Sequence, residues 1–326
     1  MTNTNPILAE ILRGSTVESQ HRGAFVVVDA KGHIVSAEGD FCSPIFPRSA
    51  VKAFQCVPLI TSGAAQYFGL TDEEIALCCA SHSGEAEHVR VASSILRKAG
   101  IDEAAYECGV HWPERMDDRT ALIKLGEGPR AIHNNCSGKH AGMLALAKYL
   151  GAPLSGYVMK DHPVQKAVAQ ALDKYCNADT ANAPWGTDGC SVPTWALPLE
   201  NAARGFAKLF ADGNAVGARI ANSVRANPFM VAGTAKFDTR IMQAVPRLFV
   251  KVGAEGVYCG ALPHASIGFA LKIDDGASRG AEVAIARVLS ELDCWTADEA
   301  RAISEFTHST IRNWRKLEVG ATRASF

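Results

Sequence analysis

Apolar runs near both ends of the chain predict β-strands. Residues 24–29 are apolar and β-branched, a Lys-Gly turn follows them, and residues 33–36 run back as a second strand. Towards the other end, runs at 248–252, 256–260 and 267–273 predict three further strands. We therefore expect the two ends of the chain to supply a sheet.

Helical spacing dominates the middle of the chain. Apolar positions recur at helical intervals from residue 49 to about 62, directly after prolines break the chain. Thr71 and Glu74 have the spacing of a capping box, and Ser83 can cap a helix that Gly100 closes. Further helices are predicted over residues 140–150, 163–175, 199–211, 215–224, 234–244 and 281–292, and from a second capping box at Thr296.

Together these patterns predict an α+β fold with a helical insertion. The chain has 326 residues, 48% of them hydrophobic, which is enough for a sizeable buried core. We expect a single domain over residues 1–326. Its sheet region should cover about 1–48 and 246–326, and its helical region about 49–245.

Charge and composition argue against several classes of partner. The formal net charge is -1, so the chain lacks the basic excess that binds a nucleic-acid backbone. It has no Lys/Arg run that would seek an anionic membrane, and no apolar segment long enough to span one. The N-terminus lacks the pattern of a secretory signal, and the ten cysteines then read as reduced thiols. The sequence therefore predicts a cytoplasmic protein.

The sharpest chemical feature is an S-x-x-K sequence, formed by Ser49 and Lys52 at the start of a predicted helix. Side chains three residues apart share a helix face, so Lys52 can reach the Ser49 hydroxyl. Serine is a poor nucleophile until a base takes its proton, and a desolvated lysine can be that base. The alternative is an ordinary surface Ser and Lys. The preceding hairpin favours a catalytic pair, because serine β-lactamases place S-x-x-K early and K-T-G late.

A late partner for this pair is the K-x-G sequence that begins at Lys251. K-x-G also occurs at 98–100 and 124–126, where it ends helical patterns as ordinary capping. Lys251, by contrast, lies on a predicted strand. By analogy with penicillin-binding proteins, the backbone N–H groups of Ser49 and Ala254 would form the oxyanion hole.

Two polar runs are further candidates. Ser81 begins the run S-H-S-G-E after an apolar helix, and a helix cap explains Ser83 but not Ser81. Asn134 and Asn135 open a polar run before another helix, where side chains suit either capping or recognition of a ligand carboxylate or amide. Both readings of each run stay open from the residues alone.

Cysteine spacing does not by itself indicate a metal site. Asp188 begins a turn before a buried segment and is followed closely by Cys190. Cys136 and Cys190 could bind a soft metal with a nearby His or Asp, but the chain has no C-x-x-C pattern and the two lie far apart. A turn followed by a core cysteine explains the Asp188 segment equally well.

Taken together, these blocks resemble the rhizobial-type L-asparaginases, the class 3 or asparaginase II family. The resemblance runs along nearly the whole chain and does not extend to the asparaginases with threonine nucleophiles. It is carried by FPRSAVKAFQ (46–55), CCASHSGE (78–85), NNCSGKHAGML (134–144), DGCSVPTWALPL (188–199), KVGAEGVYCGALP (251–263) and ALKIDDG (270–276).

The resemblance implies a fold, a reaction and a metal. The fold would be similar to penicillin-binding proteins, serine β-lactamases and glutaminases, an antiparallel sheet with covering helices. Two Ser–Lys pairs would do the chemistry, Ser49 with Lys52 and Ser81 with Lys251, although Lys272 is the alternative for the second lysine. The resemblance also implies a homodimer. Finally, it implies a zinc ion that tunes affinity without being clearly required for chemistry, held by Cys136, Lys139 and Cys190 with Asp188 close by.

The expected reaction is hydrolysis of L-asparagine to L-aspartate and ammonia. Ser49 would attack the side-chain amide, with Arg48, Asp188, Asn134 and Asn135 gripping the charged ends of the substrate. A glutaminase is the first alternative, because one methylene in a pocket discriminates only modestly. A β-lactamase works outside the cytoplasm and is disfavoured here. A non-catalytic amino-acid-binding protein is the remaining alternative.

Overall fold

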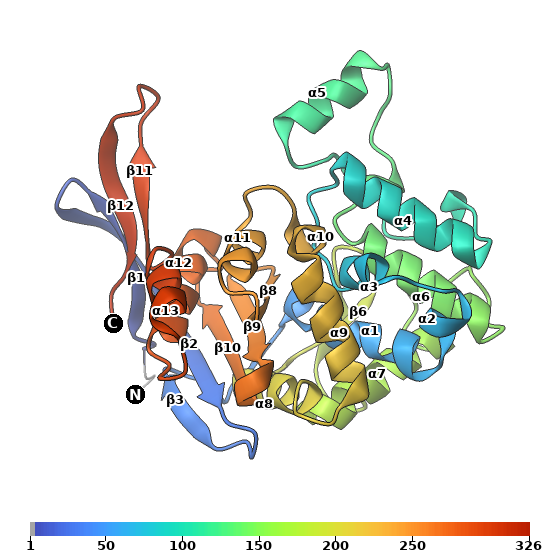
Figure 1. Cartoon of the computed structure of the whole chain (residues 1–326), viewed down its shortest axis with the longest axis horizontal. Helices are drawn as coiled ribbons and strands as arrows, with labels where there is room; N and C mark the ends of the chain where they lie inside the picture. Colours follow the sequence, from blue (N-terminus) through green and yellow to red (C-terminus); the bar gives the residue numbers. More distant parts are fainter. Residues whose placement is uncertain (1–3) are drawn as a thin grey trace. The chain divides into compact units, whose positions relative to one another are not determined.

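The computed structural model describes residues 4–326, so the first three residues of the N-terminal segment lie outside the described part. The chain divides into two compact units. The sheet unit comprises the residues up to Ala50, Leu197–Ala211 and Ile241–Phe326, and the helical unit comprises Val51–Ala196 and Asp212–Arg240. Figure 1 follows the chain from one to the other by colour. No helix within residues 4–326 is long and apolar enough to cross a membrane.

The sheet unit is built on eight strands whose neighbours all pair antiparallel. In pairing order they are β11 (His308–Arg312), β12 (Glu318–Ala324), β1 (Ile7–Arg13), β2 (Thr16–Val28), β10 (Ile267–Ile273), β9 (Val257–Leu262) and β8 (Phe249–Gly253), with β3 (Ile34–Glu38) on β2.

Strand β2 joins the two halves of this sheet. Its residues 16–22 pair with β1, and its residues 23–28 pair with β10, while β3 pairs with residues 25–28. Residues 24–28 in its second half are all buried, and they belong to the apolar run from which the strand was predicted. Strand β1 in turn pairs with β12, which places Ala9 opposite Ala324. The first and last strands of the chain are therefore neighbours.

Helices cover this sheet on their apolar sides. Helix α8 (Leu199–Leu209) packs on β10 and β2, and helix α12 (Ser278–Ser290) packs on β12, β1 and β10. Helix α13 (Ala297–Ser304) packs on α12. The remaining short elements are β4 (Pro44–Ile45) paired with β7 (Leu197–Pro198), and the 3-10 helix η4 (Pro263–Ala265).

The helical unit is arranged around α6 (Ser137–Tyr149), whose residues 137–147 are all buried. Helices α1, α3, α4 and α7 pack against it. The helices of this unit are α1 (Lys52–Thr61), α2 (Ala64–Tyr67), α3 (Asp72–Cys78), α4 (Ala86–Ala99), α5 (Met116–Lys124), α7 (Pro163–Cys176), α9 (Ala215–Ala226) and α10 (Pro228–Ala232), with 3-10 helices η2 (Glu103–Ala105) and η3 (Ala131–His133) and a small β5 (Trp185–Thr187) and β6 (Pro193–Trp195) pair. Helices η1 (Arg48–Val51) and α11 (Phe237–Ala244) each span a boundary between the units.

The predicted α+β class, with an antiparallel sheet, covering helices and a helical region, is confirmed. Both capping boxes form, with Thr71 and Thr296 accepting from the backbone three residues on. Other local expectations were wrong. The helix expected from residue 49 begins as the 3-10 turn η1, and α11 begins at Phe237, three residues late. The hairpin of β11 and β12 was not predicted, because its residues are mostly exposed and polar.

The expected cap at Ser83 was also wrong. Helix α4 begins at Ala86, and the N–H of Glu85 donates to Nδ1 of His88 at 3.2 Å. The Ser83 hydroxyl instead donates to the carbonyl of Ala232 at 2.6 Å, a residue far along the chain. The Ser83 hydroxyl therefore bonds a residue distant in sequence instead of capping the helix that follows it.

Candidate active site

Ser49 lies in the turn η1, which follows β4 and a buried proline. The preceding residue, Arg48, has a φ of 52°. This left-handed backbone costs a non-glycine residue about 1–2 kcal/mol, and such strain gathers at functional sites. The chain therefore reaches Ser49, which is half-buried, through a strained turn.

Strand β8 ends against this turn. A Cβ added at Gly253 would lie 2.4 Å from the Pro47 carbonyl oxygen and 3.1 Å from the Ala50 nitrogen. Only glycine permits so close an approach, which explains the glycine of the K-x-G sequence. Ala254 then begins the turn to β9, where Glu255 has a φ of 61°.

Two lysines were weighed for the late partner. Lys251 is fully buried on β8, two residues before Gly253, and its Nζ donates to the Val252 carbonyl at 2.7 Å. Lys272 is half-buried on β10, and its Nζ donates to the Glu255 carbonyl at 2.8 Å. The placement of the second catalytic lysine at Lys251 stays a prediction.

Lys52 is the first residue of α1 and is fully buried. Its Nζ donates to Oγ of Ser81 at 2.9 Å, to Sγ of Cys136 at 3.1 Å and to the carbonyl of Ala80. A lysine ammonium has three donors, and these partners use all of them. The sequence paired Lys52 with Ser49, whereas this contact joins it to Ser81.

The backbone of the Ser81 loop is held on both sides. The N–H of Ser81 donates to the Val231 carbonyl at 2.9 Å, and the N–H of His82 donates to the Asn135 carbonyl at 3.0 Å. Burial and the neighbouring His88 and Lys52 charges hold the pKa of His82 well below its usual value. The neutral His82 ring accepts from the backbone of Gly84 and bonds the Ser137 hydroxyl at 3.0 Å.

Asn134 was expected to contact substrate, but its side-chain amide is hydrogen-bonded to backbone groups of the protein. Its Oδ1 accepts from the Cys136 N–H at 2.9 Å. Its Nδ2 donates to the carbonyls of Cys108 at 2.9 Å and Gly109 at 3.1 Å. These bonds fix the entry to α6, which carries Lys139. Asn135 is half-buried beside it.

Cys136, Lys139 and Cys190 come together in the helical unit. Nζ of Lys139 lies 2.9 Å from Sγ of Cys190, and the Cys190 thiol is hydrogen-bonded to Cys136. Asp188 is close by, with its Oδ2 4.0 Å from Sγ of Cys190. The resemblance to the asparaginase family predicted this grouping, whereas residue spacing did not.

The charges in this cluster are shifted by burial and by each other. Hydrogen bonding from Cys190, together with Lys52 and Lys139, outweighs burial and holds the pKa of Cys136 well below its usual value. The same hydrogen bond and burial raise the pKa of Cys190. Burial works against the ammonium of Lys139, yet the two thiols raise its pKa. Burial and hydrogen bonding therefore set the two thiols apart, with the pKa of Cys136 lowered and that of Cys190 raised.

Thiolate sulfur and nitrogen are the donors that zinc prefers, so this set fits the ion. No group of three or more His, Cys, Asp or Glu side chains in the described residues could hold a metal. The candidate set of Cys136, Lys139 and Cys190 therefore depends on Lys139 for its third donor. Its amine would have to lose a proton to coordinate, because an ammonium has no lone pair.

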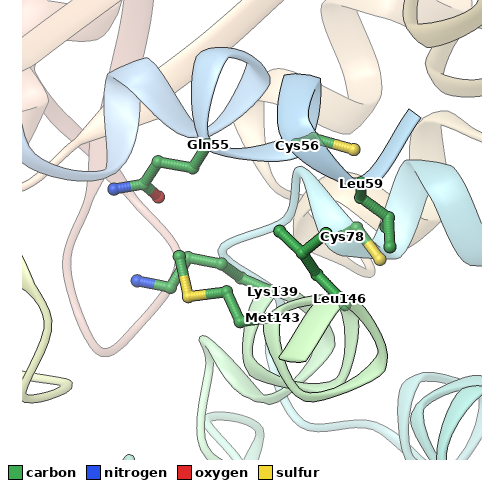
Figure 2. A pocket seen from close by; sticks show the side chains of 8 residues that line it. Gln55, Cys56, Leu59, Cys78, Lys139, Met143 and Leu146 are labelled. Carbon is green, nitrogen blue, oxygen red and sulfur yellow. The ribbon is translucent and has the colours of Figure 1, made fainter. Parts of the chain in front are cut away.

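A small cavity of about 10 Å³ adjoins Lys139, and residues of α1, α3 and α6 line it. The amide of Gln55 and the amine of Lys139 point to the same side of it (Figure 2). Oε1 of Gln55 is buried without a hydrogen-bond partner. A cavity of this size holds about one water molecule, which would satisfy such an oxygen.

The link between Lys52 and Cys136 was missed by the sequence reasoning. It joins the predicted Ser–Lys chemistry to the predicted metal ligands through one hydrogen bond of 3.1 Å. The two residues are 84 positions apart, so no spacing pattern could have found it. The sequence shows which residues stand at these two positions, but their contact arises only when α1 packs against α6.

Of the comparisons with known proteins, the family match agrees with the resemblance. No curated protein matches the sequence. Among solved structures, Mglu in its native form shares 14% identity over 85% of this chain and 66% of its own, with a TM-score of 0.40, so this chain spans just under two thirds of that length. A β-lactamase from Mycobacterium bovis shares 13% identity over 87% of this chain and 95% of its own, with a TM-score of 0.27. Residues 9–324 match the family described as L-asparaginase II. Because that match spans nearly the whole sequence, the chain belongs to the L-asparaginase II family.

Proposed function

We propose that this protein hydrolyses L-asparagine to L-aspartate and ammonia with a Ser–Lys apparatus. Family membership supports an amidohydrolase activity of the asparaginase type. The observation that carries the mechanism is the fully buried amine of Lys52, 2.9 Å from the Ser81 hydroxyl. A buried amine on a serine hydroxyl can take up a proton and return it through that hydroxyl, which is the role that the mechanism gives to Lys52 and Ser81.

In the proposed mechanism Ser49 is the nucleophile. Its oxygen bonds to the side-chain amide carbon, and Lys52 in its neutral form takes the proton. The N–H groups of Ser49 and Ala254 stabilise the oxyanion. The carbon–nitrogen bond then breaks and ammonia leaves with a proton that Ser81 relays from Lys52. Water hydrolyses the aspartyl ester and frees Ser49, while Lys251 supplies positive charge.

Arg48, Asp188 and Asn135 are the proposed contacts to the substrate's carboxylate and amino groups. For Asn134 the hydrogen bonds favour an indirect role, because both polar atoms of its amide are used within the fold. It would place the backbone of Asn135 and Cys136. Substrate contact by Asn134 remains the alternative.

A zinc ion held by Cys136, Lys139 and Cys190, with Asp188 nearby, is also proposed. When bound, the ion would supply fixed positive charge, which would raise the affinity for a substrate that carries a carboxylate. The chain's own residues carry the proton transfers. Cys136 accepts a hydrogen bond from Lys52, so loss of the metal ligand would disturb the base as well.

The proposal is tested by ammonia release from L-asparagine and L-glutamine. Ser49→Ala should abolish release from L-asparagine, and Ser155→Ala, at an exposed serine of the helical unit, should not. Repeating the assay with a chelator shows whether ammonia release depends on a bound metal. Full turnover by Ser49→Ala would refute this nucleophile. Release from neither amide by the unaltered protein would refute the amidohydrolase reading and favour an amino-acid-binding protein.

Ser81 is the second candidate nucleophile, favoured by its contact with Lys52. Mass spectrometry after rapid acid quenching locates the acyl group and decides between the two serines. Preferential release from L-glutamine would make the protein a glutaminase. Labelling by a fluorescent penicillin would point to the β-lactamase class. A homodimer is expected from the family resemblance, and light scattering measures it. The cytoplasmic location is expected from the sequence pattern at the N-terminus and the cysteine usage.

A further inference from the structure

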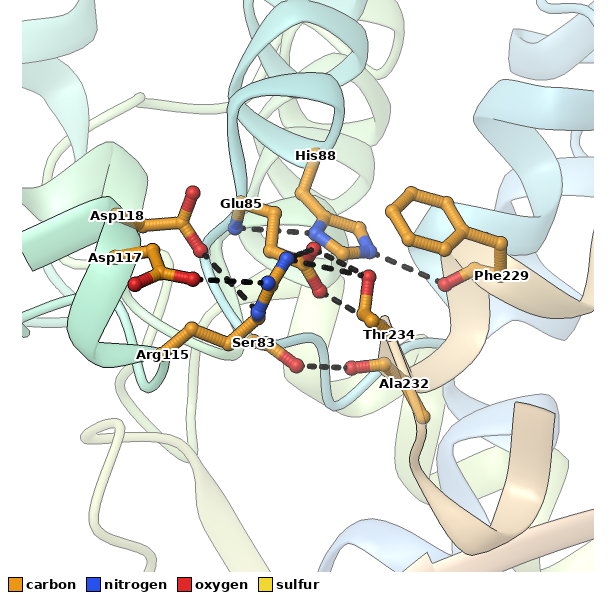
Figure 3. Close-up of polar contacts among 9 residues, drawn as sticks. All are labelled: Ser83, Glu85, His88, Arg115, Asp117, Asp118, Phe229, Ala232 and Thr234. Atoms are coloured by element: carbon orange, nitrogen blue, oxygen red, sulfur yellow. Dashed lines mark hydrogen bonds and ion pairs between the residues drawn. The ribbon is translucent and has the colours of Figure 1, made fainter. Parts of the chain in front are cut away.

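A buried carboxylate lies at the meeting point of three segments of the helical unit. Glu85 ends the Ser81 loop, and its side chain is 8% exposed. Both its oxygens are used: Oε1 accepts from the Thr234 N–H at 2.7 Å, and Oε2 accepts from the Thr234 hydroxyl at 2.7 Å and from Arg115 at 3.0 Å. Figure 3 shows Glu85 between Arg115 and Thr234. None of these residues has a role in the proposed chemistry.

The segment that ends at Thr234 carries the partner of Ser81. The Val231 carbonyl, three residues earlier, accepts the N–H of Ser81 at 2.9 Å. The neighbouring Ala232 carbonyl accepts the Ser83 hydroxyl, and the Phe229 carbonyl is bonded to Nε2 of His88 at 3.1 Å. The 229–234 segment is therefore joined to the Ser81 loop at Ser81 and Ser83 and to the first turn of α4 at His88.

Gly233 makes this close junction possible. Its φ is 113°, and a Cβ at this position would lie 2.4 Å from Oγ of Ser83 and 2.5 Å from Oε1 of Glu85. An added Cβ would collide with these atoms, so the backbone of Gly233 packs directly against the side chains of Ser83 and Glu85. The carboxylate of Glu85 then receives the first N–H beyond the glycine, that of Thr234.

Residues 113–118 close the third side. The N–H of Glu114 donates to the Ser83 carbonyl at 2.8 Å, and Arg115 pairs with Glu85. Arg115 also lies 3.4 Å from Asp117 and 3.9 Å from Asp118, which are more exposed. Burial alone would raise the pKa of Glu85, but bonds from Thr234 and Arg115 outweigh it and lower the pKa. Glu85 is thus a carboxylate held by a full set of donors.

We propose that Glu85, with Thr234 and Arg115, is a positioning residue that fixes Ser81 on Lys52 through the 229–234 segment. The proposal rests on the proposed Ser–Lys function. Its physical basis is that Ser81 must stay at hydrogen-bond distance from Lys52 while the site turns over. The Ser81 N–H contact with Val231 holds the backbone of that serine, and the Glu85 carboxylate holds the segment that carries Val231.

The test uses Glu85→Gln and Thr234→Val, with Glu87→Gln as the matched control. Glu87 lies two residues away on the exposed face and pairs with Arg90. If Ser81 moves by about 1 Å, kcat for L-asparagine should fall on the order of 100-fold in both test variants, with KM changed less than about twofold. Thr234→Ser keeps the hydroxyl and should restore most of kcat. Hydrogen exchange at the Ser81 amide should quicken in the two impaired variants only.

Unchanged kcat and unchanged Ser81 exchange in both test variants would overturn the proposal. A fall in melting temperature with KM and kcat lost together would show a merely structural role and overturn it too. If Glu85→Gln does not fold, Thr234→Val alone tests the proposal, because the Glu85 carboxylate is still present in that variant. If the unaltered protein releases no ammonia, the proposed function fails. Hydrogen exchange at the Ser81 amide then tests by itself whether Glu85 and Thr234 hold the Ser81 backbone: faster exchange in the two test variants supports this, and unchanged exchange overturns it.

Discussion

Gly253→Ala is the perturbation whose effect the structure defines most sharply. The new Cβ would lie 2.4 Å from the Pro47 carbonyl oxygen and 3.1 Å from both the nitrogen and the Cβ of Ala50. Real Cβ contacts of the first kind essentially do not occur. The obstructing atoms are two backbone atoms and the Cβ of Ala50, none of which can rotate out of the way, so β8 and the turn η1 must separate.

Overpacking of this kind costs about 1–3 kcal/mol of unfolding free energy. Each kcal/mol lowers the melting temperature by roughly 2–4 °C in domains of a few hundred residues. The larger effect should be on turnover, because the displaced turn carries Ser49 and the following residue, Ala254, is the proposed oxyanion donor. A misplacement of about 1 Å costs on the order of 100-fold. We therefore expect kcat to fall far more than stability.

The assay measures ammonia release and thermal unfolding of Gly253→Ala beside Gly128→Ala. Gly128 has no atom within 4 Å of an added Cβ, so the same substitution there should change neither quantity. If Gly253→Ala kept full kcat and melting temperature, β8 would not press on the turn of Ser49. Lys251 and Ala254 would then not be held beside Ser49 by this contact.

Three further predictions concern the base, the metal ligands and the acid limit. Lys52→Met removes the proposed base, so turnover should fall about 100- to 10,000-fold, and the buried acceptors it abandons should lower the melting temperature; retained turnover would exclude Lys52. Cys190→Ala should reduce bound zinc in elemental analysis while Cys176→Ala, another buried cysteine, does not; equal zinc in both would remove Cys190 from the ligand set. A bidentate bond from Arg247 lowers the pKa of Glu299 from 4.5 to about 2. The depressed pKa means the pair stabilises the fold above pH 4.5 and loses this effect as pH falls towards 2. Denaturant titrations should therefore show Glu299→Gln less stable than the unaltered protein at neutral pH, with the difference shrinking as pH falls from 4.5 towards 2; a difference that stays constant would contradict this.

Features set by residues within a few positions of each other could be predicted from the sequence. The capping boxes at Thr71 and Thr296 and the left-handed Gly100 after α4 depend on local backbone and side chains. Strand β10 matches its predicted bounds, 267–273, because a continuous apolar run is typical of a strand buried on both faces.

Features set by tertiary contacts could not be predicted in this way. Ser83 has the chemistry of a local cap, but its hydroxyl donates a hydrogen bond to a carbonyl 149 positions away. Lys52 lies one turn after Ser49 in sequence, yet it donates to Ser81, 29 positions away. The set of Cys136, Lys139 and Cys190 was named through family resemblance, because a lysine among cysteines matches no common spacing of metal ligands.

The pairing of β1 with β12 has a consequence for how the protein is made. Because Ala9 pairs opposite Ala324, β1 remains an open sheet edge on the ribosome until the last strand has been translated. Residues 51–196 and 212–240 can all have emerged while that edge is still bare. Pairings across such long sequence separations form slowly, and unpaired edges invite aggregation. Shortening the chain before residue 318 would remove β12 and leave that edge uncovered.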